Sequence, residues 1–167
     1  MDFSVDFRIN EINEFLNSNE RDCVLCYSGD EVDSVKVLID GFFKYIEKYK
    51  DVDSFVSGAL VSKNKIHDSY NLYFYKCLKN IGAYNLEYDF DDHFDDHFVF
   101  KYKNKNISFD FIHNVSEDIY ETYHGREIRY LAFDNKQDFD IKTYDMFKTI
   151  SRSSCRFMPR VIKSTYK

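Results

Sequence analysis

The sequence contains no tryptophan, one proline and five glycines among 167 residues. So little proline and glycine excludes collagen-like and Pro/Gly-rich low-complexity chains. There is also no apolar run of the roughly 18 residues that a membrane-spanning helix needs, so we expect no contact with a membrane. The first residues, 1–6, lack the basic and apolar regions of a secretory signal peptide. These absences together predict a cytoplasmic protein.

Apolar and aromatic residues are plentiful: 44% of the chain is apolar, with 17 Phe and 14 Tyr. Intrinsic disorder is excluded because disordered chains have few aromatics and low hydrophobicity. A chain of this length usually forms one domain and buries about 70% of the surface that it exposes when unfolded. The four cysteines are expected to be free thiols, because no export signal directs the chain to an oxidising compartment.

The spacing of apolar residues predicts both helices and strands. Helices are expected over 9–16, 31–49, 68–82 and near 138–151, and strands over 23–27, 54–62, 84–90, 98–102, 107–111 and 127–133. The strands after residue 83 alternate apolar and polar residues, and Lys103–Asn106 is predicted to turn a hairpin between two of them. The predicted fold class is therefore α+β: a single compact domain in which an antiparallel strand meander packs with about four helices.

Charge divides the chain into two parts. Residues 142–167 hold seven Lys or Arg and one acid, whereas residues 1–141 hold 16 basic and 28 acidic residues. The sequence thus predicts an acidic α+β body (1–141), followed by a basic C-terminal helix and tail (142–167) of the same domain.

The basic segment is a candidate surface for nucleic acid or for a protein partner. Lys148, Arg152 and Arg156 recur at a spacing of four, which would put them on one helix face, and Arg160 and Lys163 follow the helix-breaking proline. Such cations bind phosphate backbones without reading sequence. The alternative is that they pair with the chain's own acidic body.

An acidic segment is the second candidate surface. The tetrapeptide Asp-Asp-His-Phe at 91–94 is repeated at once at 95–98, and Asp91, Asp92, Asp95 and Asp96 would form the partner-binding surface. Three interpretations remain open: a solvated loop, an acidic surface that binds a partner or mimics DNA, and a metal site completed by Asp110 and His113. The last would make the protein a metal-dependent phosphodiesterase or nuclease. The acidic mimic would inhibit a bacterial defence protein.

Two further motifs give no site. Cys23 and Cys26 form a C-x-x-C pair, but a strand directs them to opposite faces, which favours buried thiols over zinc. Residues 28–30, Ser-Gly-Asp, lie where a strand leads into a helix, the usual place for a phosphate. No P-loop lysine follows, and the acids around them repel an anion, so helix capping explains them better. We therefore predict no catalytic residue, no metal and no cofactor, and a binding protein rather than an enzyme.

The chain opens Met-Asp-Phe-Ser-Val-Asp-Phe-Arg-Ile-Asn-Glu-Ile-Asn-Glu-Phe-Leu. This opening, together with the length and acidity of the whole chain, resembles the small early host-takeover proteins of T-even-type bacteriophages, most of all the Alc family of host transcription terminators. The resemblance implies an early phage protein that binds host RNA polymerase, another host protein or DNA and shuts off host transcription. It carries no motif, so it assigns no residue.

Overall fold

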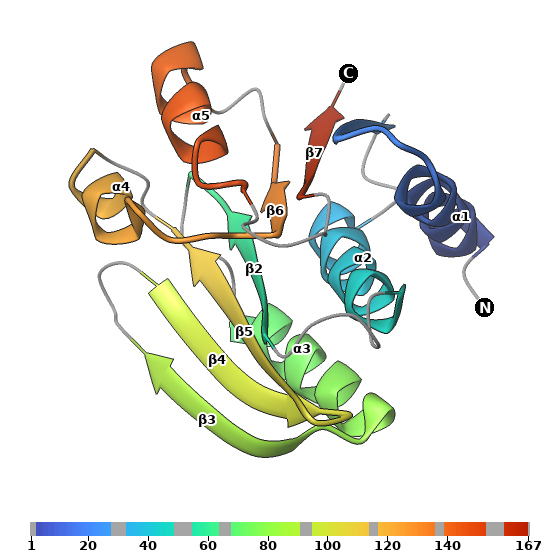
Figure 1. Ribbon diagram of the computed structural model, residues 1–167. Helices are drawn as coiled ribbons and strands as arrows, with labels where there is room; N and C mark the ends of the chain where they lie inside the picture. Colours follow the sequence, from blue (N-terminus) through green and yellow to red (C-terminus); the bar gives the residue numbers. More distant parts are fainter. Residues whose placement is uncertain are drawn as a thin grey trace.

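The computed structural model describes residues 3–27, 33–48, 55–63, 68–90, 95–113, 117–135, 139–152 and 159–166. Within them, five helices surround one seven-stranded mixed sheet (Figure 1), which confirms the predicted α+β class. The helices are α1 (Phe3–Asn17), α2 (Ser34–Lys48), α3 (Asp68–Ile81), α4 (Glu117–Tyr123) and α5 (Ile141–Lys148). The strands are β1 (Asp22–Tyr27), β2 (Phe55–Val61), β3 (Tyr84–Phe90), β4 (Asp95–Tyr102), β5 (Lys105–Ile112), β6 (Tyr130–Phe133) and β7 (Arg160–Tyr166).

The sheet has a parallel part and an antiparallel part. Its strand order is β1-β7-β6-β2-β5-β4-β3. The first five of these strands run parallel; β4 then pairs antiparallel with β5, and β3 pairs antiparallel with β4. The predicted meander is thus β3–β4–β5, and it continues a parallel sheet of the kind that carries ligand sites at the carboxyl ends of its strands.

Helices cover both faces of the sheet (Figure 1). On one face, α1, α2 and α3 bury the larger apolar cluster, which is centred on Phe42, Phe74 and Phe109. On the other face, α4 and α5 cover a smaller cluster that contains Phe133 and Phe147. None of the helices that the structure describes is long and apolar enough to cross a membrane.

The backbone confirms the predicted hairpin turn and shows two positions that suit glycine. Gly58 in β2 lies at a close approach, since a Cβ there would lie 2.5 Å from Cε2 of Phe42. Gly82 ends α3 with φ +75°, and the N–H of the next residue bonds to the carbonyl of Leu78. Lys103 and Asn104 turn the β4–β5 hairpin with φ 46° and 64°, as a type I′ turn requires.

The C-terminal segment differs from its prediction. The last helix ends at Lys148, and residues 160–166 form β7, which lies between β1 and β6 in the sheet. These residues are therefore not a basic tail beside an acidic body. Helix α4 was also absent from the predicted elements.

Candidate functional site at the carboxyl edge of the parallel strands

Three side chains meet where β1, β6 and β7 end. The Ser34 hydroxyl, at the first residue of α2, donates a 2.8 Å hydrogen bond to Oδ1 of Asp134. The Ser164 hydroxyl, on β7, lies 3.2 Å from the same oxygen. Both serines are buried, with 3% and 0% of their surface exposed. We call Ser34, Asp134 and Ser164 the serine–aspartate cluster.

The strand ends hold this cluster in place. Asp134 directly follows β6, and its N–H bonds to the carbonyl of Val61 at the end of β2. The next N–H, that of Asn135, donates a 2.7 Å bond to the hydroxyl of Ser164. Asn135 has φ 49°, a left-handed conformation that asparagine tolerates better than most residues. The chain after β6 is thereby bonded to both of its neighbouring strands.

The cluster has the arrangement that holds a metal ion in P-loop NTPases. In those proteins a Ser or Thr at the start of the helix that follows the first strand, and an Asp at the end of another strand, bind Mg²⁺ beside the nucleotide phosphates. Ser34 follows β1 in this way, and Asp134 follows four buried strand residues. These residues fit the metal-binding half of such a site.

The phosphate-binding half does not fit. The P-loop pattern is G-x-x-x-x-G-K-[ST], and the corresponding segment here is Tyr27-Ser-Gly-Asp-Glu-Val32-Asp33-Ser34. An aspartate thus stands where the lysine that contacts the phosphates belongs. The loop itself, residues 28–32, lies outside the described residues.

Asp33 is also fixed at the helix start. Its carboxylate accepts the hydroxyl of Tyr70, at 3.0 Å from each oxygen, and caps α2 by accepting the N–H of Lys36 at 3.3 Å. Asp33 thus caps α2, whereas residues 28–30, for which capping was expected, lie outside the described residues. A carboxylate held at the N-terminus of α2 occupies the position where a phosphate would bind and repels one.

The predicted basic surface is divided by the fold. Arg160 is buried, with 2% exposed, because its guanidinium bonds to backbone at the end of α1. Its acceptors are the carbonyl oxygens of Phe15, Leu16, Ser18 and Glu20. The prediction that Arg160 faces a partner is wrong, since the last carbonyls of a helix need donors and this arginine supplies them.

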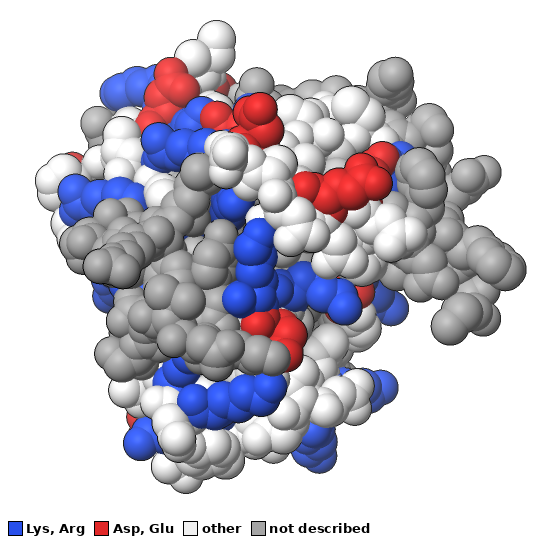
Figure 2. All heavy atoms as spheres, turned by 45° about the vertical axis from the view of Figure 1, so that its right-hand side comes forward, with Lys and Arg blue, Asp and Glu red and all other residues white. Residues whose placement is uncertain are grey.

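The described ones among the other predicted cations do not share a helix face. Lys148 pairs with Asp22 at 3.0 Å, so it is the internal counter-ion that the alternative interpretation described. Lys163 bonds to the hydroxyl of Tyr144 at 2.9 Å. Arg152 lies beyond α5 and is exposed, and Arg156 lies outside the described residues. On the face in Figure 2, basic and acidic side chains lie next to each other rather than in separate halves.

The acidic segment is only partly described. Asp91 and Asp92 lie outside the described residues, as does the side chain of Asp95. Asp96 is 1% exposed and accepts a 2.9 Å bond from Nδ2 of Asn71, so it is not part of an open acidic surface.

The neighbouring His97 contacts Asp110 across the β4–β5 pair. Together with Ser57, Ser108 and Arg129 they line a cavity of about 420 Å³. His113, offered as a further ligand, is fully buried beyond the end of β5. Within the described ranges, no three His, Cys, Asp or Glu side chains come together in a way that could hold a metal ion.

The cysteines differ in exposure. Cys23 is half-buried, and burial raises the pKa of its thiol to about 11, with Glu11 adding to the effect. Cys26, three residues on, is exposed, so the prediction that both thiols are buried is wrong for Cys26. The alternation of a strand directs one of them to the core and the other to solvent.

Comparison with known proteins gives a likeness of fold. No protein-family model and no curated protein sequence matches the chain. The structure is similar to the large terminase of the thermophilic bacteriophage D6E, with a TM-score of 0.71, 11% identity and 95% of this chain covered. A second structure of that terminase, in complex with ADP, has a TM-score of 0.67. The chain spans 38% of the length of either terminase chain.

This likeness corrects the earlier resemblance. A chain whose fold is that of part of a large terminase does not support membership of the Alc family, and the predicted shutoff of host transcription through RNA polymerase is wrong. The alternatives tied to the Asp/His segment, a nuclease and a DNA mimic, are not supported either. The misleading features were the opening residues and the length and acidity of the chain, none of which specifies a fold.

Sequence reasoning missed the serine–aspartate cluster. One signal was available: Tyr130–Phe133 is a short apolar run that ends directly in Asp134. Such a run with a terminal Asp is the form of a metal-holding strand in P-loop proteins. Ser34 gave no comparable signal, because its contact with Asp134 spans 100 residues and depends on the strand order.

Proposed function

We propose that this chain acts in phage DNA packaging as a terminase-like domain that does not bind or hydrolyse ATP. The fold likeness to a large terminase supports the packaging role. The observation that carries the second part is Asp33, which caps α2 and bonds to Tyr70 at the place of the phosphate-binding lysine. The chain would then work by binding other components of the packaging reaction.

The serine–aspartate cluster supports a structural role for the rest of the site. In a nucleotide-loaded P-loop protein the serine and the aspartate take part in holding Mg²⁺. Here the two bond to each other, and Ser164 bonds to the same carboxylate. The cluster thereby ties the start of α2 to the ends of β6 and β7.

The ATP part of the proposal is tested with purified protein, Mg²⁺ and ATP by calorimetry. We expect no saturable binding by the wild type up to about 1 mM, the upper end of ordinary enzyme KM values. Replacing Val32→Gly and Asp33→Lys together restores the end of the P-loop pattern, and we expect measurable Mg²⁺-dependent binding. Adding Ser34→Ala to that variant removes the hydroxyl and should weaken the binding of ATP again. Tight binding of ATP by the wild type would contradict the proposal.

The packaging part needs a separate measurement. In a defined reaction of empty capsids, large terminase, DNA and ATP, the amount of DNA protected from added nuclease reports packaging. We expect the folded chain to change that amount, and heat-unfolded chain at the same concentration to leave it unchanged. No effect at a large molar excess would reject the packaging role while leaving the result on ATP intact.

A further inference from the structure

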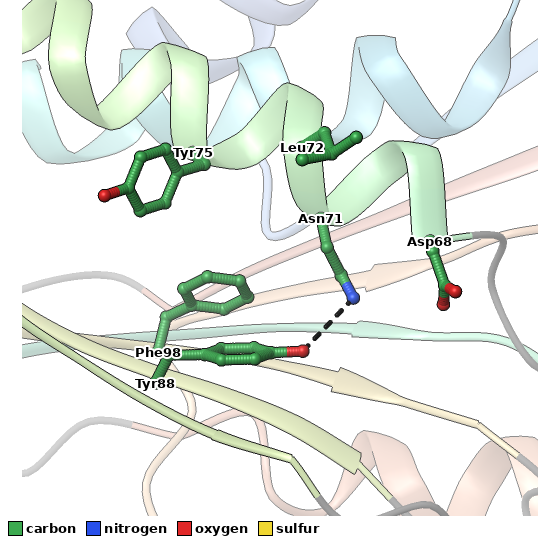
Figure 3. A pocket seen from close by; sticks show the side chains of 6 residues that line it. All are labelled: Asp68, Asn71, Leu72, Tyr75, Tyr88 and Phe98. Atoms are coloured by element: carbon green, nitrogen blue, oxygen red, sulfur yellow. Dashed lines mark hydrogen bonds between the residues drawn. The ribbon is translucent and has the colours of Figure 1, made fainter.

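A second cavity lies between α3 and the antiparallel strands β3 and β4. Its volume is about 550 Å³, within the range of small-molecule and side-chain sites. Figure 3 shows the helix above and the two strands below, with side chains from both directed into the space between them. The lining residues are Asp68, Asn71, Leu72, Tyr75, Tyr88 and Phe98.

The walls of this cavity are apolar and open to solvent. Leu72 is 66% exposed, Tyr88 48% and Tyr75 42%, whereas Phe98 forms a buried floor and packs against Tyr88, with ring centroids 4.7 Å apart and ring planes tilted by 42°. Single exposed apolar residues are ordinary, but three around one cavity form a contiguous patch. The patch offers aromatic faces to a ligand.

The polar groups of the cavity accept hydrogen bonds. Asp96, behind the lining, is buried and accepts Nδ2 of Asn71 at 2.9 Å and the hydroxyl of Tyr88 at 3.5 Å. Because a carboxylate can only accept, these bonds fix the amide of Asn71 with its Oδ1 turned away from Asp96. That Oδ1 is buried and has no hydrogen-bond partner within the described parts of the chain. Asp68 adds a carboxylate at the rim.

The charges around the cavity favour a cation. Asp68 at the rim and Asp96 behind the lining are acidic, and the described lining residues include no Lys, Arg or His. Such a surface repels the phosphates of a nucleic acid, so stacking of a nucleobase is disfavoured. The ring of Tyr75 already makes one cation–π contact within α3, because Nζ of Lys79 lies 5.0 Å from its centroid. Aromatic faces next to carboxylates are the usual surroundings of bound cations.

We propose that this cavity binds the arginine side chain of a protein partner. A guanidinium is planar and stacks on a tyrosine face, and its N–H groups suit the carboxylate of Asp68 at the rim. The aliphatic part of the arginine would cover Leu72. An ammonium lacks the flat face and the fork of donors, so lysine would bind more weakly. This site does not depend on the proposed packaging role.

The test uses two short peptides, acetyl-Gly-Arg-Gly-amide and the same peptide with citrulline, which has the shape of arginine and no charge. Titration is followed by NMR at the side-chain amide of Asn71 and at the rings of Tyr75 and Tyr88. We expect weak saturable binding of the arginine peptide that falls as salt is added, and binding of the citrulline peptide at least about fivefold weaker.

Variants locate the binding. Tyr75→Ala and Asp68→Asn should each weaken the arginine peptide by about three- to tenfold. Tyr84→Ala is the matched control, because Tyr84 is 44% exposed on β3 and does not line the cavity. Equal binding of the two peptides, equal loss in the Tyr84 variant, absence of binding, or stronger binding of a single-stranded oligonucleotide at the same signals would each overturn the proposal.

Discussion

Asp40 is a half-buried carboxyl group whose ionisation is linked to folding. It lies on α2 and accepts a 2.6 Å hydrogen bond from the hydroxyl of Tyr73 on α3. Burial raises its pKa, although Tyr73, Lys44 and Lys36 act in the opposite direction. Since the folded state holds the proton of Asp40 more tightly than the unfolded state does, ionisation of this group costs stability at neutral pH.

We expect Asp40→Asn to be more stable than the wild type near neutral pH. A folded-state pKa above the unfolded one gives a contribution that is fully present below the unfolded pKa, about 3.9, and is lost as the pH rises through the folded pKa. Asparagine keeps an acceptor for Tyr73 and carries no charge. Urea unfolding at about pH 4, 5.5 and 7 should therefore show a difference in free energy that grows with pH. A difference in free energy that shrinks as the pH rises would refute the raised pKa of Asp40.

At the scale of the elements, the turn of the β4–β5 hairpin depends on the φ angles of two residues. Lys103 and Asn104 both have positive φ, and Lys103 also lies 3.6 Å from Glu47 and over the ring of Tyr102. Asn104 carries no such side-chain contact among those that the structure gives. It can therefore be changed to probe the turn alone.

We expect Asn104→Ala to lower the free energy of unfolding by about 1 kcal/mol, because a Cβ other than that of Asn or Asp is strained at φ 64°. Asn104→Gly should keep or slightly raise stability, since glycine adopts this conformation without strain. Thermal unfolding of both variants gives the comparison. Equal effects of the two substitutions would mean that the side chain, and not the backbone angle, matters at this position.

Some helices and strands could be predicted from the sequence, whereas strand β7 could not. Helices α2 and α3 and strands β3 to β5 have clear periodic patterns, and their predicted bounds lie within a few residues of those observed. In β7 only Val161, Ile162 and Tyr166 are apolar, and Arg160 and Lys163 beside the first two suggested a charged tail. The pattern failed because Arg160 is buried by bonding to carbonyls rather than by being apolar.

On the scale of the whole molecule, Arg160 connects the last strand to the first helix. Its guanidinium bonds to the carbonyls at the end of α1 and packs on the ring of Phe15, with the centroid 5.1 Å away. This joins residues more than 140 positions apart, as in the bond to Leu16. The contact thus stabilises the overall fold and is separate from any binding surface.

We expect Arg160→Met to lower the free energy of unfolding by about 2–4 kcal/mol, because the aliphatic stem is kept while several buried carbonyls lose a charged donor. Arg152→Met, on an exposed side chain, should change it by less than about 0.5 kcal/mol. Chemical unfolding of both variants measures the difference. If Arg152 proved the more important of the two for stability, the role given to Arg160 would be wrong.

The candidate site could be predicted only in part, because some of its contacts join residues that are far apart in the sequence. The absence of a P-loop lysine was visible in the sequence, and Asp33 at that position now explains why a phosphate is disfavoured there. The contact between Ser34 and Asp134 was not visible, because it requires β1, β7 and β6 to lie side by side. Neither periodicity nor composition carries information about strand order.

The place of β1 in the sheet has a consequence for the order of events during synthesis. Among the described strands β1 leaves the ribosome first, and its strand neighbour β7 leaves last. The β2–β5 pairing and the β3–β4–β5 meander can form as the middle of the chain emerges, whereas the hydrogen-bonding edge of β1 waits until residue 166 has been made. An unpaired strand edge of this kind is open to other chains in the meantime. Co-translational folding should therefore begin in the middle of the sheet, with the serine–aspartate cluster assembled in the final step.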